Sequence, residues 1–268
     1  MIPLEEHDYD FFMLGVEARN AEMKITAVDD IIISAAGTSG SDSQQHRLPT
    51  SMKLVKKKEI KMPSRVCHYK GNTYVARGFG MSIAKIDGDG RITEGIINVI
   101  TFVNGLIAHD DRLYAAIRDF HQTNVVVYQL SDKMVHSLKH INFKALTVFR
   151  DQLVIAEVNK FIIHSLTGER LRVVGCNQLG TRKVSLCHAG GDSIIVTKCD
   201  ASPAMLKFNL ATAAVEWTSN DVKQPSAVAM LNKKYALVTE NQSSDHVKLF
   251  IIDQTNGENG FNRFYMLL

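Results

Sequence analysis

The chain has 268 residues, of which 45% are hydrophobic and 22% are charged, and its formal net charge is +3 at pH 7. This composition is typical of a globular protein with a sizeable core, and it excludes a disordered or fibrous chain. By itself this charge is too small to indicate nucleic acid or an anionic membrane as a partner, and we expect neither DNA nor a membrane. The apolar runs are far shorter than the roughly 20 residues that span a bilayer, and the polar start at 1–10 does not resemble a secretory signal. We therefore expect one soluble domain over residues 1–268, located in the cytoplasm.

A short apolar segment that ends in a small residue or threonine recurs six times along the chain. Each copy is rich in β-forming residues, and neighbouring copies are spaced by 40 to 42 residues. The anchor positions are Ala35, Ala76, Ala116, Ala156, Thr197 and Thr239. A constant period of this length indicates a repeat architecture.

Each anchor segment is preceded by residues that favour a tight turn. Glycine, asparagine and aspartate tolerate the positive φ angles that hairpin turns require. These turn signals are Asp29-Asp30, Lys70-Gly71-Asn72, Asp110-Asp111-Arg112, Arg150-Asp151-Gln152, Gly190-Gly191-Asp192 and Asn232-Lys233-Lys234. Another apolar stretch lies before each turn and a third follows each anchor, whereas no segment shows apolar residues at helical spacing. Each repeat therefore reads as about four short antiparallel strands.

A four-stranded unit of this length is typical of a β-propeller blade. One twisted sheet cannot cover both of its faces, so stacking the blades in a ring buries them. We predict an all-β, six-bladed propeller of four-stranded antiparallel blades, closed by chain termini that form a clasp from the apolar segments 9–16 and 261–268. The predicted blades are approximately 20–61, 62–100, 101–141, 142–180, 181–221 and 222–265.

The stretch MPSRVCHYKGNTYVARGFGMSIAKIDGDGRI at 62–92 resembles an NHL repeat. The matching positions are Pro63, Gly71, Asn72, Tyr74, Val75, Ala76 and the turn at 87–90. The usual aspartate that closes the second strand is replaced by Arg77, Ile117, Glu157 and Lys198. NHL propellers often form the C-terminal part of tripartite-motif (TRIM) proteins, where they bind RNA or protein. The resemblance implies a substrate- or RNA-recognition domain of a ubiquitin-ligase-type protein, and any ligase chemistry would lie outside this chain.

Basic and aromatic residues recur in the loops that a propeller gathers at one end of its ring. Cationic groups neutralise phosphates and aromatic rings stack on splayed bases, while the same side chains also suit a protein partner. The candidate binding residues are Arg65, Arg77, Phe79, Arg118, Phe120, His121, Phe143, Lys144, Lys160, Arg182, Lys183, Lys198 and Lys223. The sequence therefore predicts a binding module without catalytic residues, cofactor or metal, whose partner is a protein or single-stranded RNA.

The alternative is a small-molecule hydrolase or lactonase with a divalent metal at the propeller axis. Oxygen ligands for such a metal would come from Asn104, Glu157, Asn159, Asp200 and Glu240, and this set suits calcium. These residues stand at different offsets in different blades, however, and no common catalytic motif is present.

The four cysteines have no paired short spacing, so we expect structural free thiols. Trp217 falls on a predicted outer strand and is expected to pack between blades.

Overall fold

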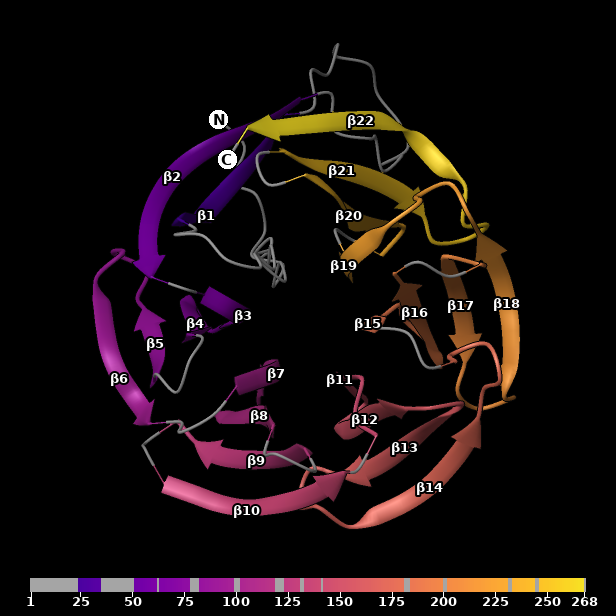
Figure 1. Ribbon diagram of the computed structural model, residues 1–268, viewed down its shortest axis with the longest axis horizontal. Coiled ribbons are helices and arrows are strands. Elements are labelled where there is room, and N and C mark those ends of the chain that lie inside the picture. Colours follow the sequence, from indigo (N-terminus) through magenta and orange to yellow (C-terminus); the bar gives the residue numbers. More distant parts are fainter. Residues whose placement is uncertain are drawn as a thin grey trace, which may run out of the picture.

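The structure, a computed structural model, consists of β-sheets arranged in a ring around a central axis (Figure 1). It describes residues 24–34, 51–61, 63–77, 82–98, 102–118, 123–130, 133–140, 142–180, 184–199, 202–230, 233–243 and 246–267. Five of the sheets have four antiparallel strands in chain order, with the first strand nearest the axis and the fourth at the periphery. The fold is therefore a β-propeller, and we name these five sheets blades A to E.

The strands of the five blades are short and follow one another without other elements between them. Blade A contains β3 (Pro63–Tyr69), β4 (Asn72–Arg77), β5 (Ser82–Ile86) and β6 (Ile92–Asn98). Blade B contains β7 (Phe102–His109), β8 (Arg112–Arg118), β9 (Thr123–Gln129) and β10 (Lys133–His140). Blade C contains β11 (Ala145–Phe149), β12 (Gln152–Glu157), β13 (Lys160–Ser165) and β14 (Arg170–Gly175). Blade D contains β15 (Val184–His188), β16 (Ser193–Lys198), β17 (Met205–Asn209) and β18 (Ala214–Ser219). Blade E contains β19 (Pro225–Met230), β20 (Tyr235–Ser243), β21 (His246–Asp253) and β22 (Asn259–Leu267).

The predicted first blade, 20–61, is not a four-stranded sheet in the described residues. Its place in the ring, between blades E and A in Figure 1, is taken by a hairpin of β1 (Lys24–Ser34) and β2 (Ser51–Lys61). The prediction of six four-stranded blades is therefore wrong, because the described residues form five. The turn expected at Asp29-Asp30 does not form, since β1 runs through both residues. An aspartate pair permits a turn without requiring one, and one long ladder satisfies the same backbone groups.

The clasp that we predicted from both termini finds no support. Residues 9–16 lie outside the described residues. The other segment, 261–268, falls almost entirely within β22, which pairs with β21 as the outermost strand of blade E. Through this pairing the segment completes its own blade.

The predicted hairpin turns are present between the first and second strands of blades A, B and C. Both central residues of each turn have a positive φ, which is the conformation that matches the twist of a two-residue hairpin. The φ angles are 48° and 71° at Lys70 and Gly71, 49° and 52° at Asp110 and Asp111, and 43° and 55° at Arg150 and Asp151. The turn signals read from the sequence are thus confirmed in these blades.

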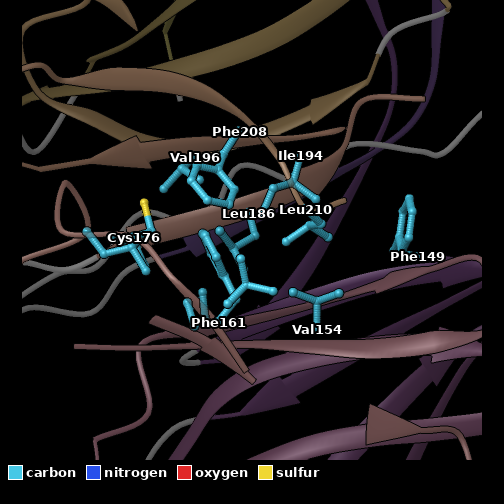
Figure 2. Packing of buried hydrophobic residues seen from close by; sticks show 14 of the residues in the cluster. Phe149, Val154, Phe161, Cys176, Leu186, Ile194, Val196, Phe208 and Leu210 are labelled. Atoms are coloured by element: carbon cyan, nitrogen blue, oxygen red, sulfur yellow. The ribbon is translucent and has the colours of Figure 1, made fainter. Parts of the chain in front are cut away.

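The repeated small residues lie on the second strand of each blade, as expected. Ala76, Ala116 and Ala156 have no exposed surface, and Thr197 and Thr239 are buried. Large side chains from both neighbouring sheets fill the space around them. Figure 2 shows the cluster between blades C and D, in which Phe161 and Phe208 lie with their ring centroids 5.2 Å apart. Small residues at the anchors let neighbouring sheets approach closely. The regular spacing of these residues along the sequence therefore reflects the packing of the blades.

Trp217 on β18 confirms the expected packing between blades. Its Nε1 donates a hydrogen bond to the carbonyl of Gln254 in blade E, at 2.9 Å. The four cysteines are free thiols, and burial raises the pKa of Cys67 and Cys176. Within the described ranges, no helix is long and apolar enough to cross a membrane.

Candidate partner-binding face

The two ends of the ring are built from different kinds of connection. At one end, which we call the loop face, each first strand begins, each second strand ends, and the segments that join the blades cross. At the other end, which we call the turn face, lie the tight hairpins such as Lys70-Gly71 and Asp110-Asp111. The candidate binding residues that the structure describes belong to the loop face or to the strand ends that form it.

Lys198 ends the second strand of blade D and is almost completely buried, with 2% of its surface exposed. Its Nζ donates a hydrogen bond to the carbonyl of Gln178, at 2.8 Å, in the segment that joins blades C and D. Desolvation lowers the pKa of Lys198, and the nearby Cys176 thiol acts in the opposite direction. This lysine therefore connects two parts of the fold and does not present its charge to solvent.

Glu157 and Glu240 occupy the same position in blades C and E, and both are buried. Glu240 Oε1 accepts hydrogen bonds from the backbone N–H groups of Lys223 and Gln224, at 2.9 and 3.4 Å. Glu157 Oε2 lies 3.2 Å from Nζ of Lys160. Glu157, one of the residues that replace the closing aspartate of the NHL pattern, and Glu240 thus hold local side-chain and backbone groups in place.

Two arginines of blade A are also engaged within the fold. Arg65 Nε donates to the carbonyl of Asn104 in blade B, at 2.8 Å. Arg77 Nη1 lies 2.8 Å from Oε2 of Glu94 on β6. Arg65 thus connects β3 to β7, and Arg77 connects β4 to β6.

Phe143 and Lys144 lie in the segment between blades B and C, and both are half-buried. A Cβ atom added at Gly105 would lie 3.0 Å from Cζ of Phe143, so this ring packs closely on blade B. The backbone N–H of Lys144 donates to the carbonyl of Ala156, at 2.8 Å. Phe143 therefore serves mainly to pack the blades together, and its ring is not an exposed surface for stacking.

Among the candidate residues that the structure describes, Arg118 and Lys223 are exposed at the loop face. Arg118 ends β8, and its Cα partner across the ladder is Phe102, which begins β7. Phe102 is 45% exposed, and sequence reasoning did not include it among the binding residues. A signal was available, because an aromatic residue at the start of a first strand lies at the loop face. The structure thus places an exposed aromatic ring beside an exposed arginine.

Five of the candidates cannot be placed. Phe79, Phe120, His121, Arg182 and Lys183 lie outside the described residues.

Four of the five candidate metal ligands lie among the described residues, and Asp200 lies outside them. In the part of the chain that the structure describes, no group of three or more histidine, cysteine, aspartate or glutamate side chains could hold a metal ion. Asn159 Oδ1 accepts a hydrogen bond from the backbone N–H of Gly180, at 3.1 Å, while Glu157 and Glu240 are engaged as described above. These oxygen atoms are already used for structural contacts.

Fold and face together define the class of this protein as a β-propeller of four-stranded blades. No family model matches the chain, and no curated protein matches it either. Solved structures do resemble it. A chain of the nidogen/laminin complex has a TM-score of 0.62 and 14% identity over 81% of this chain and 87% of that chain.

Two further solved structures are similar. A protein of unknown function from Bacteroides caccae has a TM-score of 0.55 and 12% identity, covering 81% of this chain and 85% of that chain. The computationally designed protein Ika8 has a TM-score of 0.50 and 13% identity, covering 80% of this chain and 65% of that chain. Similarity at such low identity supports the fold alone.

Proposed function

We propose that this chain is a non-catalytic binding module whose loop face recognises a protein partner. The observation that carries the proposal is the exposed pair of Phe102 and Arg118, which lies at the loop-face end of blade B. Directly opposed residues on neighbouring strands place their Cβ atoms about 5 Å apart on one side of the sheet. Aromatic and arginine side chains are enriched among the residues that dominate protein interfaces. A similar fold in a chain of the nidogen/laminin complex is consistent with such a role.

Single-stranded RNA is the second candidate partner, and the loop face supports it less. RNA binding requires several cations that can reach phosphates. Lys198 is buried, and Arg77 and Lys160 are paired with carboxylates. Arg118 and Lys223 keep exposed cationic groups. An aromatic ring beside one arginine therefore resembles a hot spot of a protein interface more than a surface that binds a series of phosphates.

The finer assignments belong to this proposal. The NHL resemblance of 62–92 would make the module the recognition part of a TRIM-type ubiquitin ligase acting in the cytoplasm. In that arrangement the propeller selects the substrate, and the ligase chemistry lies elsewhere.

The test compares capture by immobilised wild-type protein with capture by the double variant Phe102→Ala/Arg118→Glu, using extract from the source cells and quantitative mass spectrometry. We expect the double variant to lose specific protein partners by about tenfold or more, as expected for a hot spot. Arg91→Glu is the matched control, because Arg91 is exposed at the turn face. Equal capture by all three proteins would contradict the proposal.

A parallel assay measures binding to a random single-stranded RNA pool over a range of salt concentrations. Loss of binding with a steep dependence on salt would indicate several phosphate contacts. Such a result, with no protein partner lost in the double variant, would replace the protein proposal with RNA recognition.

A further inference from the structure

The outermost strand of blade C, β14, is exposed along almost its whole length. Five of its six residues are exposed, and only Val174 is buried. Two of its exposed side chains are large and apolar: Leu171 is 45% exposed and Val173 is 42% exposed. Apolar surface of this kind on a peripheral strand is a feature of interaction sites when it is combined with polar neighbours.

The two sides of β14 differ in chemistry. In the ladder with β13, Phe161 pairs with Val174, Ile162 with Val173 and Ile163 with Arg172. Since side chains alternate between the faces of a strand, Arg172 lies on the same face as Val174, which packs in the cluster between blades C and D. Val173 lies on the opposite face, toward blade B.

The arginines of β14 are not used by the fold as it is described. Arg170 and Arg172 are exposed, and neither has an ion-pair partner among the residues that the structure places. Glu169, the exposed residue before the strand, donates its backbone N–H to Ser165 Oγ. Two cationic groups therefore remain available on a strand that also exposes two aliphatic side chains.

A groove of about 400 Å³ continues from the end of this strand. It lies between the outer parts of blades C and D, and Figure 2 shows Cys176 and Phe208 at this junction. The lining residues are Gly175, Cys176, Asn177, Gln178, Phe208, Ala213 and Val215. The groove therefore exposes both polar and apolar surface, with two amide side chains in its lining, on the face of β14 that carries Arg172.

Two other outer strands show a different pattern. On β18, Glu216 is bonded to Ser193, Asn209 and Lys207, and Trp217 is bonded to blade E. On β6, Glu94 is paired with Arg77. The charged side chains of β6 and β18 are thus engaged with their own or the next blade, in contrast to those of β14.

The outer edge of β14 presents unpaired backbone groups, because the strand pairs only with β13 in the described sheet. A bulge between Ile163 and His164 interrupts the ladder near Arg170, so the regular part of the edge runs from Arg172 to Gly175. Charged residues on an edge strand also serve to prevent aggregation. That role does not account for the two exposed aliphatic side chains or for the groove beside them.

We propose that β14 accepts an extended segment of a protein partner as a fifth strand of blade C. Strand addition obtains affinity from backbone hydrogen bonds and specificity from alternate side chains. The side chains of the added strand would alternate, with apolar residues on the side of Val173 and acidic residues on the side of Arg172. This surface is separate from the loop face and adds a second, peripheral site of contact.

The probe is a short fluorescent peptide in which valine and glutamate alternate, and binding is measured by anisotropy. Wild-type protein should bind it saturably, and the same peptide with lysine in place of glutamate should bind at least about tenfold more weakly. The double variant Arg170→Glu/Arg172→Glu should reverse this preference. Phe102→Ala/Arg118→Glu is the control and should bind the peptide like wild type, which separates this proposal from that for the loop face.

Hydrogen exchange distinguishes strand addition from a loose charge contact. Backbone amides between Arg172 and Gly175 should gain protection when the glutamate peptide is bound. Three results would overturn the proposal: no saturable binding by wild type, equal binding by the arginine variant, or binding without added protection on β14. Protection of these amides without peptide, together with a concentration-dependent dimer, would show that the edge pairs with a second copy instead.

Discussion

The turn face and the loop face use charged residues in opposite ways. On the turn face, exposed side chains of successive blades pair with each other across the surface. Lys70 lies 3.0 Å from Asp111, His109 lies 2.8 Å from Asp151, and Arg150 lies 2.9 Å from Asp192. The three aspartates belong to the hairpin turns of blades B, C and D.

On the loop face, buried charges bond to backbone groups of the segments that join the blades. Lys198 bonds to the carbonyl of Gln178, and Glu240 accepts from the N–H groups of Lys223 and Gln224. This difference shows where charged residues contribute to stability. Exposed pairs are screened by water and contribute little, whereas a buried polar group without its partner is costly.

The prediction with the largest expected effect tests whether the stability of the turn face depends on close packing rather than on charge pairs. Gly257 has a φ of 77°, and a Cβ atom there would lie 2.6 Å from Trp217. We expect Gly257→Ala to lower the free energy of unfolding by about 2–4 kcal/mol, from backbone strain and overpacking together. Urea unfolding measures this.

Gly71→Ala is the matched control for that substitution. Gly71 has a similar φ of 71°, but no atom lies within 4 Å of the added Cβ. Its cost should be only the backbone strain of about 1–2 kcal/mol. Equal losses in the two variants would show that the Trp217 contact has no energetic weight.

The second prediction concerns the buried carboxylate of the loop face. Glu240→Ala removes the acceptor for two backbone N–H groups and should destabilise the protein by about 1–3 kcal/mol. Glu240→Gln keeps an acceptor oxygen and should recover a large part of the loss. If the two variants were equally stable by thermal and urea unfolding, these hydrogen bonds would not explain the contribution of Glu240 to stability.

The third prediction is a pH dependence at Lys198. Its pKa in the folded protein lies below the ordinary value of 10.5 because of desolvation. Between these two values the unfolded chain binds more protons than the folded chain, so stability rises with pH. The wild type should therefore gain stability relative to Lys198→Met as the pH is raised toward 10.5. Parallel profiles for the two proteins would contradict a shifted lysine.

The smallest effect is expected from the exposed pairs of the turn face. The double variant Asp151→Asn/Asp192→Asn removes the partners of His109 and Arg150. We expect a loss below about 1 kcal/mol for each pair, decreasing further with added salt. A loss as large as that of Glu240→Ala would remove the contrast between the two faces.

The repeat made a large part of the fold predictable. The spacing of Ala76, Ala116 and Ala156 indicated where each second strand lies, and the turn residues before them indicated where the chain reverses. These features are local, because each depends on a few neighbouring residues. The failure at Asp29-Asp30 has the same origin, since a local signal that permits two outcomes cannot decide between a turn and a continuous strand.

The binding face was predictable only as a location. Sequence reasoning placed Arg118 and Lys198 in one class, yet the first is exposed and the second is buried. It also passed over Phe102, although its position at the start of a first strand indicated the loop face. The arginines of β14 were missed because nothing in their local sequence distinguishes an exposed side chain from one covered by the next blade.

The sequence by itself determined an all-β propeller with a period of about 40 residues, because small residues and turn formers act within a single blade. The tertiary structure alone decided the number of four-stranded blades, which charges are buried, and which edge remains open. Each of these depends on groups supplied by a neighbouring blade, and burial of a charge is settled only by the partner that it finds there.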